Sequence, residues 1–368
     1  MTDYGFPILK YEKGKSFNEW GIYHGEEFRG AIKELVQIRK HLMLQKNPAL
    51  RNHLKSLAHE QFEATKNFAP GISRELEGIA TGSGLTLEDI VILNNYTDFR
   101  DITLPDEGCS TIQIQRENTI LSGQTWDMHS SAKNFLSIIE IPESENGPSS
   151  IILSLLGCTG LMGINSHQCL IGVNNINTTN AKVGMIWPVL VRQTLLQNDL
   201  NSMRKTLLDA PVTSGHNYLI SSKSGAEHWE ITPTQNDLIH AHGEKEIGHS
   251  FHTNHCLGEK VTLLENKKSI SATTFARFEL LEKKVPNINS YNELKNLLQG
   301  HDGYPKSICS HYDTGAKDPS MTCGGGIADL NEEKYVFWRG CSEYDKSYKE
   351  ANYIIDPISK NFKRVVNE

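Results

Sequence analysis

A glycine-cysteine pair, Gly108 and Cys109, stands where the sequence changes from a helical to a strand-like pattern. The chain continues as "STIQIQ", turn residues "REN" and then "TILSGQTWD", which predicts a hairpin that carries Cys109, Thr111 and Asp127. A thiol is a good nucleophile only as the thiolate, so a catalytic cysteine needs a base or a positive field nearby. No histidine adjoins Cys109, and a buried structural thiol is the ordinary alternative.

The base can be the α-amino group of Cys109 itself, once the Gly108–Cys109 peptide bond is cut. An α-amine has a pKa of about 7.7–8.0, which suits proton acceptance near neutrality. Gly108 has no β-carbon, so the thiol can approach the preceding carbonyl. Asp127 would orient the new α-ammonium group and the thiol, and Thr111 places a hydroxyl on the same side of the strand as Cys109. These residues predict a self-cleaving site.

The hairpin "GCST…GQTWD" resembles the nucleophile hairpin of the acyl-coenzyme A:isopenicillin N (6-aminopenicillanic acid) acyltransferase-like proteins, peptidase family C45, a branch of the N-terminal nucleophile hydrolases. Further segments are similar to those of the family over roughly residues 21–340. They are "ELEGIATGSGLTLEDIVILN", "GCTGLMGINSHQCLIGVNNI", "WPVLVRQTLL" and "HTNHCLGE".

The resemblance implies that Cys109 is the autoproteolytic and catalytic nucleophile, that Asp127 holds its surroundings, and that Asn254 supplies an oxyanion-hole amide. Such an amide stabilises a transition state by roughly 3–4 kcal/mol. The arginine that penicillin-forming members carry before the closing hairpin is missing from "DPSMTCGGG". Three other arginines are candidates to replace it: Arg192, Arg277 and Arg339.

The resemblance also implies the fold, a four-layer αββα sandwich of the α+β class. Residues 1–368 would form one autoprocessed domain, cut into a mainly helical fragment 1–108 and a fragment 109–368 that carries the nucleophile. The two fragments would stay associated, and self-association of the whole protein is left open.

The composition excludes several classes of protein. The chain has 368 residues, a net charge of -7 and 38 % hydrophobic residues, which allows a large core and offers no basic face for nucleic acid. The first residues do not resemble a secretory signal and no apolar run has the length of a membrane span, so we expect a soluble cytoplasmic protein without a membrane partner. Seven cysteines without a CxxC pair argue against a disulfide framework and a zinc ribbon.

The periodicity of apolar residues predicts elements that fit this fold. Helices are expected over residues 26–98, starting at Phe28 and interrupted at Gly82 and Gly84. Strands are expected at "FLSIIEI", "SIILSLL", "CLIGV", "NYLISS", "AEHWEIT" and "DLIHAH". Further helices are expected near residues 187–197, 201–209, 273–284 and 291–298, and "CGGGIADL" with "KYVFWRG" would close the chain as a last hairpin.

We therefore predict amide hydrolysis or acyl transfer through a Cys109 thioester, with no cofactor. The substrate would be a small acylated amine, an amino-acid amide or an acyl thioester. Two alternatives stay open: a non-catalytic binding protein with the same sandwich that is never cut, and a metalloenzyme built on a histidine cluster. That cluster comprises His240, His242, His249, His252 and His255.

Overall fold

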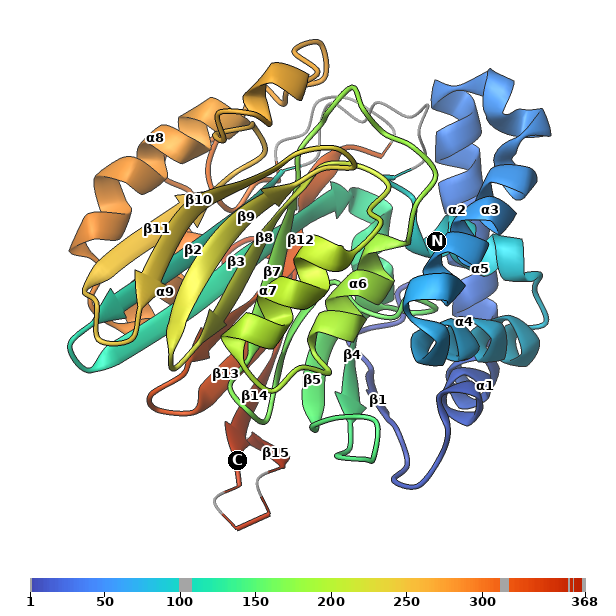
Figure 1. Ribbon diagram of the computed structural model, residues 1–368, viewed down its shortest axis with the longest axis horizontal. Coiled ribbons are helices and arrows are strands. Elements are labelled where there is room, and N and C mark those ends of the chain that lie inside the picture. Colours follow the sequence, from blue (N-terminus) through green and yellow to red (C-terminus); the bar gives the residue numbers. More distant parts are fainter. Residues whose placement is uncertain (1, 99–107, 312–317, 357, 360, 366–368) are drawn as a thin grey trace.

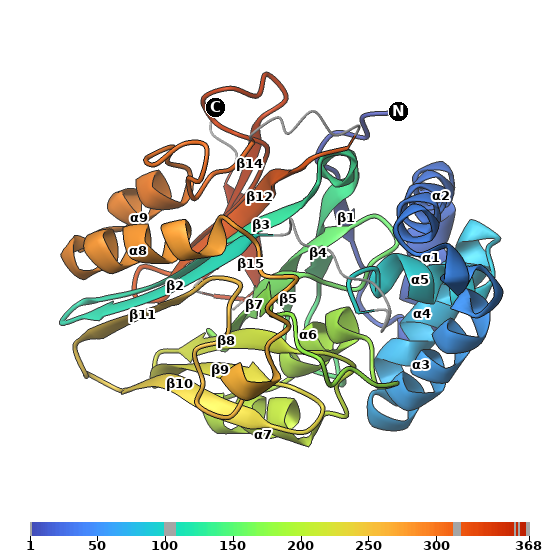
Figure 2. The same cartoon turned by 90° about the horizontal axis from the view of Figure 1, so that it is seen from above.

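The computed structural model describes residues 2–98, 108–311, 318–356, 358–359 and 361–365. Within them, two β-sheets lie face to face and helices cover both outer faces (Figure 1). The view from above shows the layers in the order helix, sheet, sheet, helix (Figure 2). The predicted αββα sandwich is therefore confirmed.

The first sheet has eight strands in the order β1-β4-β5-β6-β7-β8-β9-β10. Its first strand is parallel to β4, with Ile8 opposite Ile138, and the other pairs are antiparallel. The strands are β1 (Ile8–Lys10), β4 (Leu136–Ile141), β5 (Ser150–Leu155), β6 (Met162–Asn165), β7 (Leu170–Asn175), β8 (His216–Ser222), β9 (Gly225–Ile231) and β10 (Asn236–Gly243).

The second sheet has seven antiparallel strands in the order β11-β2-β3-β12-β13-β14-β15. The predicted hairpin supplies its second and third strands, β2 and β3. The strands are β11 (Gly248–His252), β2 (Cys109–Arg116), β3 (Thr119–His129), β12 (Ser320–Asp329), β13 (Lys334–Arg339), β14 (Lys349–Ile355) and β15 (Phe362–Val365).

Two pairs of helices form the outer layers. The pair α6 (Trp187–Thr194) and α7 (Leu200–Asp209) covers the first sheet, and the pair α8 (Thr274–Lys284) and α9 (Tyr291–Leu298) covers the second (Figure 2). Ile112 and Ile114 of β2 are fully buried against Leu281 of α8 and Leu294 of α9. The alternate residues of β2 therefore face the first sheet, and Cys109 and Thr111 belong to that face.

The N-terminal helices pack together at one end of the sandwich, beside β1 and β4 (Figures 1 and 2). They are α1 (Phe17–Glu27), α2 (Arg29–Lys46), α3 (Leu54–Phe68), α4 (Pro70–Ser83) and α5 (Leu87–Asn94). Helical structure thus begins eleven residues before Phe28, the predicted start, because Ser16 and Glu19 form a capping box that starts α1.

The predicted interruption at Gly82 is wrong, because this glycine lies inside α4 and serves helix packing. A β-carbon on Gly82 would lie 2.2 Å from the carbonyl oxygen of Ile22 in α1, and one on Gly78 would lie 2.3 Å from that of Asn18. The interruption at Gly84 is confirmed: this residue ends α4 in the left-handed conformation, with φ of 67°.

The hairpin of β12 and β13 is formed as predicted, but it is not the last one. The chain continues into β14 and β15, which extend the same sheet. In β14 the buried residues Ala351, Tyr353 and Ile355 alternate with less buried ones, whereas most of β15 is exposed. Within the described residues, no helix combines the length and apolarity needed to cross a membrane.

Candidate active site

Cys109 is the first residue of β2 and is 7 % exposed. It pairs with Trp126 of β3, whereas Thr111 pairs with Gln124. Cross-strand partners point to the same face of a sheet, so the side chains of Cys109 and Thr111 lie on the face between the two sheets. Asp127 is the next residue after Trp126, and its side chain belongs to the opposite face.

The backbone of Cys109 is held on both sides. Its N–H donates to Oδ1 of Asn254 at 2.8 Å, and its carbonyl oxygen accepts from Nη1 of Arg277 at 2.7 Å. The strand β11 pairs with β2 up to His252 opposite Thr111, which brings the following residues to the start of β2. Asn254 thus reaches Cys109 although it lies far away in the sequence.

Arg277, on the second turn of α8, has a fully buried guanidinium group at the centre of this site. Besides the carbonyl of Cys109, it donates to Oγ of Ser110 at 3.0 Å and to Oδ1 of Asn254 at 2.8 Å. At the start of the same helix, Oγ1 of Thr274 accepts from the backbone N–H of Asn254 at 2.8 Å. The helix therefore positions both polar residues that contact Cys109.

Of the three arginines considered from the sequence, only Arg277 contacts the hairpin at Cys109. Arg192 lies next to Glu75 of the N-terminal helices, with Nε 3.8 Å from its carboxylate. Arg339 donates to the carbonyl oxygens of Lys133 and Ser347 and to Asp3. The sequence alone did not separate these three, because none of them belongs to a local motif.

Gly108 lies between the side chains of Asp127 and Arg277. A β-carbon at this position would be 2.8 Å from Oδ2 of Asp127 and 2.9 Å from Nη2 of Arg277. Both distances are too short for a real β-carbon, so any other residue would push these groups apart. The close approach of Asp127 and Arg277 therefore favours glycine before the cysteine.

Asp127 is 3 % exposed and accepts a hydrogen bond from the Thr322 hydroxyl at 2.7 Å. Burial raises the pKa of its carboxyl group from 3.8 to about 7, although the charge of Arg277 and the Thr322 hydrogen bond act in the opposite direction. An acid with this pKa exchanges its proton near neutral pH.

Thr111 is part of a hydrogen-bonded network between the sheets. Its hydroxyl donates to Oδ1 of Asn174 on β7 at 2.6 Å, and Nδ2 of Asn217 on β8 donates to the same oxygen at 2.7 Å. This hydrogen bond of the Thr111 side chain links the two sheets, two residues along β2 from Cys109.

The family described as acyl-coenzyme A:6-aminopenicillanic acid acyl-transferase matches residues 114–334, which is more than half of the chain. The chain belongs to this family. A curated relative, the acyl-coenzyme A:6-aminopenicillanic-acid-acyltransferase 40 kDa form of Emericella nidulans, is 23 % identical over 303 residues, which cover 81 % of this chain and 83 % of the relative. The chain is therefore an enzyme of the acyltransferase type, and the resemblance seen in the sequence is confirmed.

Solved structures show weaker likeness. An N-acylethanolamine-hydrolyzing acid amidase ortholog of Caenorhabditis elegans is 11 % identical with a TM-score of 0.43, and covers 61 % of this chain and 93 % of its own. Penicillin V acylase of Agrobacterium tumefaciens is 11 % identical with a TM-score of 0.42, and covers 67 % and 92 %. At these scores the likeness supports no assignment of substrate.

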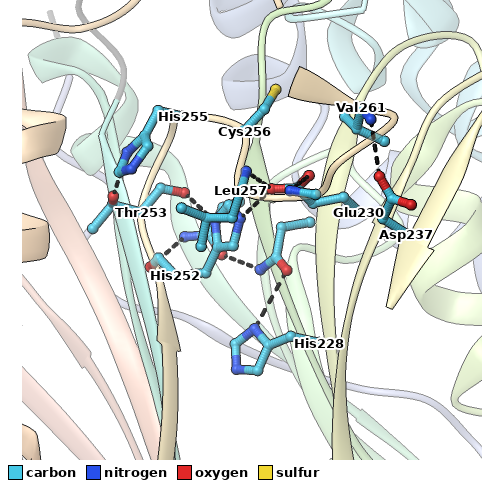
Figure 3. Close-up of polar contacts among 12 residues, drawn as sticks. His228, Glu230, Asp237, His252, Thr253, His255, Cys256, Leu257 and Val261 are labelled. Carbon is cyan, nitrogen blue, oxygen red and sulfur yellow. Dashed lines mark hydrogen bonds and ion pairs between the residues drawn. The ribbon is translucent and has the colours of Figure 1, made fainter. Parts of the chain in front are cut away.

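The five histidines of residues 240–255 do not lie around one common centre in this protein. His252 Nε2 lies 2.7 Å from Glu230 Oε1, whose side chain also accepts from the backbone of Leu257 (Figure 3). His255 instead contacts the hydroxyls of Thr253 and Thr274. Among the described residues, these histidines form no group that could hold a metal ion.

Figure 3 shows what these polar residues do instead. Glu230 binds the backbone N–H groups of Leu257 and Gly258, and Asp237 binds that of Val261 (Figure 3). Two carboxylates thus fix the loop that follows Asn254. The sequence motif "HTNHCLGE" is explained by the shape of this loop, in addition to the contact of Asn254 with Cys109.

Proposed function

We propose that this enzyme is a cysteine N-terminal nucleophile amidohydrolase or acyltransferase that cuts itself between Gly108 and Cys109 and then acts through a Cys109 thioester. The observation that carries the proposal is the way the junction is held: Asn254 binds the nitrogen of Cys109 and Arg277 binds its carbonyl oxygen. Fragments 1–108 and 109–368 would remain together, because they share the packed interior of the molecule.

Self-cleavage would start with attack of the Cys109 sulfur on the carbonyl carbon of Gly108. The thiol proton passes to the nitrogen of Cys109, the C–N bond breaks, and a thioester with a free α-amine is formed. Water then hydrolyses the thioester, which leaves a carboxylate on Gly108 and restores the thiol. Asn254 Oδ1, which accepts from the Cys109 N–H, would hold the leaving nitrogen during this step.

The mature enzyme would use the α-amine of Cys109 as the base. It takes the thiol proton, the thiolate attacks the carbonyl carbon of an amide or thioester, and the protonated amine gives its proton to the leaving group. Water or an amine resolves the acyl-enzyme. The negative charge of Asp127 would orient the α-ammonium group. Arg277 would take the place of the arginine that is missing before the closing hairpin.

Two roles for Asn254 follow from its amide. Its oxygen accepts from Cys109 and Arg277, while Nδ2 donates to the carbonyl oxygen of Asn175 at 2.9 Å. This orientation supports a role in holding the α-nitrogen. The oxyanion role that the family resemblance implies stays a prediction, and requires Nδ2 to leave Asn175 and turn toward the substrate.

The first test is the covalent state of the purified protein. We expect an intact mass spectrum with two chains, 1–108 and 109–368, and an N-terminal sequence of Cys-Ser-Thr-Ile for the larger one. Cys109→Ala should stay uncut and inactive, whereas Cys169→Ala, which changes a buried cysteine outside the site, should be cut normally. A full-length wild-type chain with amidase activity would overturn the mechanism, and a full-length chain without activity would favour the non-catalytic binding protein.

The second test concerns the acceptor. The family arginine is missing from "DPSMT", and Arg277 is fully occupied by backbone and side-chain oxygens, so we expect no strong preference for an acceptor that carries a carboxylate. Hydrolysis should then exceed transfer when a labelled acyl amide is offered together with millimolar amines. Predominant formation of a new amide would show that the enzyme is an acyltransferase, and would leave the Cys109 thioester intact.

A further inference from the structure

Four potential metal ligands meet near the start of β12 and the end of β13, away from the histidines of residues 240–255. They are His301, Cys309, His311 and Cys341, and one ligand atom from each lies within 4.8 Å of the others. His301 follows α9, Cys309 and His311 precede β12, and Cys341 follows β13. Three separate segments therefore converge at one point.

The distances and residue types fit one tetrahedral ion. Zn–S bonds of about 2.3 Å and Zn–N bonds of about 2.0–2.1 Å place neighbouring ligand atoms roughly 3.3–3.8 Å apart. Sγ of Cys341 lies 3.4 Å from Nε2 of His301. The imidazoles of His301 and His311 have ring centres 4.9 Å apart and pack edge to face. Two thiolates and two imidazoles are the ligand set that zinc prefers at structural sites.

Two further observations point to a ligand. Nδ1 of His301 lies 3.0 Å from the carboxylate of Glu343, which leaves Nε2 to face the cysteines, as in carboxylate-histidine-zinc arrangements. Nε2 of His311 is buried and has no hydrogen-bond partner among the described residues. A buried imidazole nitrogen without a partner is unfavourable unless something else binds it.

We propose that His301, Cys309, His311 and Cys341 bind one structural zinc ion. All four coordination positions are supplied by the protein, so the ion has no open position for a substrate or a water molecule. Binding releases the protons of both thiols to solvent, and two thiolates balance the charge of the ion. The ion takes no direct part in the reaction proposed for Cys109.

The zinc site would also support Asp127. Ser310 lies between the ligands Cys309 and His311, and its backbone forms two bonds with Thr322: its N–H donates to Oγ1 at 2.8 Å, and its oxygen accepts from the Thr322 N–H at 2.6 Å. The Thr322 hydroxyl in turn donates to Asp127. An ion that fixes residues 309–311 therefore fixes the donor that holds the Asp127 carboxylate.

The test is metal analysis of protein purified without an affinity tag. We expect about one zinc per chain in the wild type, and loss to background in Cys341→Ser and His311→Gln. Cys169→Ser and His41→Gln change a buried cysteine and an exposed histidine elsewhere and should retain the zinc. Glu343→Gln should weaken zinc binding by about tenfold, because it removes only the partner of His301.

Cobalt provides a measurement that needs no variant. Wild-type protein freed of metal and given Co²⁺ should show the intense visible bands of a tetrahedral site and thiolate charge-transfer absorption. Three results would overturn the proposal: no zinc retained after reconstitution with a stoichiometric amount, equal zinc in the ligand variants and the wild type, or a disulfide between Cys309 and Cys341 in the mass spectrum. Gly108–Cys109 cleavage, measured on the same samples, reports separately on the reaction.

Discussion

Two fully buried arginines, Arg277 and Arg192, each lie near a buried carboxylate, but they are used differently. Arg277 donates to three oxygens around Cys109 and lies across Gly108 from Asp127. Arg192 packs 5.9 Å from the centre of the Phe17 ring, near Glu75, and its guanidinium has no hydrogen-bond partner among the described residues. Both regions thus bury an arginine, but of the two arginines only Arg277 donates several hydrogen bonds to atoms around one residue, Cys109.

The carboxylates differ in the same way. Glu75 accepts from the Tyr11 hydroxyl at 2.7 Å and joins β1 to the N-terminal helices through the loop after that strand. Burial raises the pKa of both Glu75 and Asp127, with the nearby arginine acting in the opposite direction. A shifted pKa therefore does not distinguish an active-site acid from a structural one. The distinction rests on what the arginine touches.

The largest expected effect is that of Arg277→Met. The substitution removes the donor to the Cys109 carbonyl and to Asn254, so we expect cleavage at Gly108–Cys109 to slow by at least about 100-fold. Arg277→Lys keeps the charge but loses the planar fork, and should be cut at an intermediate rate. The measurement is the fraction of cut chain over time by denaturing electrophoresis.

Arg192→Met is the matched control for Arg277→Met. It should lower the free energy of unfolding by about 3–5 kcal/mol because Glu75 loses its cationic neighbour, while the folded protein is cut at the wild-type rate. Adding Glu75→Gln should restore part of the stability. Normal cleavage in folded Arg277→Met, or slow cleavage in folded Arg192→Met, would remove the distinction between the two arginines.

Asp127→Asn should have the second largest effect. The amide keeps the size of the side chain and can still accept from Thr322, so the fold should survive. The charge that would order the new α-ammonium group is lost, and we expect cleavage, turnover or both to fall by roughly 10- to 100-fold. Glu75→Gln is the comparison in the other region and should leave both rates unchanged. Unchanged rates in Asp127→Asn would assign Asp127 a structural role only.

The raised pKa of Asp127 predicts a pH dependence of stability. Between its usual pKa of 3.8 and about 7, the folded protein holds a proton on Asp127 that the unfolded chain has lost. The free energy of unfolding therefore falls as pH rises through this window, on the order of 4 kcal/mol from this group alone. The contribution is fully present below about pH 4 and absent above about pH 8. Thermal unfolding of Asp127→Asn should show a weaker decline over the same range than the wild type, and equal slopes would contradict the assignment.

Much of the fold was predictable because local patterns and tertiary structure agree. The helix Tyr291–Leu298 begins and ends where the sequence predicts, since Ser290 and Glu293 form a capping box before an apolar stripe. The hairpin around Cys109 was also predictable from its alternation and turn. The start of α1 was missed although Ser16 and Glu19 give the local pattern of a capping box. The role of Gly82 was missed because close packing between α1 and α4 leaves no local signal except the glycine spacing itself.

The surroundings of Cys109 were only partly predictable. Asn254 was found through a family motif, whereas Arg277 carries no motif and reaches Cys109 only after α8 packs on the second sheet. The zinc ligands were missed for a similar reason: Cys309 and His311 are close in sequence, but His301 and Cys341 come from other loops. Contacts between distant segments depend on the packing of layers, which local patterns do not contain.

The smallest expected effect is that of Thr322→Val, which removes one hydroxyl next to Asp127. Asp127 loses a hydrogen bond that favours its charged form, and the N–H of Ser310 loses its acceptor. We expect the pKa of Asp127 to rise further and the free energy of unfolding to fall by about 1–3 kcal/mol. Cleavage should slow by less than in Asp127→Asn, since the carboxylate and Arg277 are both still present.

Thr322→Ser is the control for this change, because it keeps the hydroxyl and removes only a methyl group. It should be cut at the wild-type rate and with the wild-type pH profile. If the loss in Thr322→Val were due to packing alone, Thr322→Ser would show a similar loss. Zinc content should stay at the wild-type level in both, since Thr322 is not one of the four proposed ligands. If Thr322→Val changed the rate of cleavage without changing its pH profile, the Thr322 hydroxyl would act by positioning residues 309–311 and not by changing the charge of Asp127.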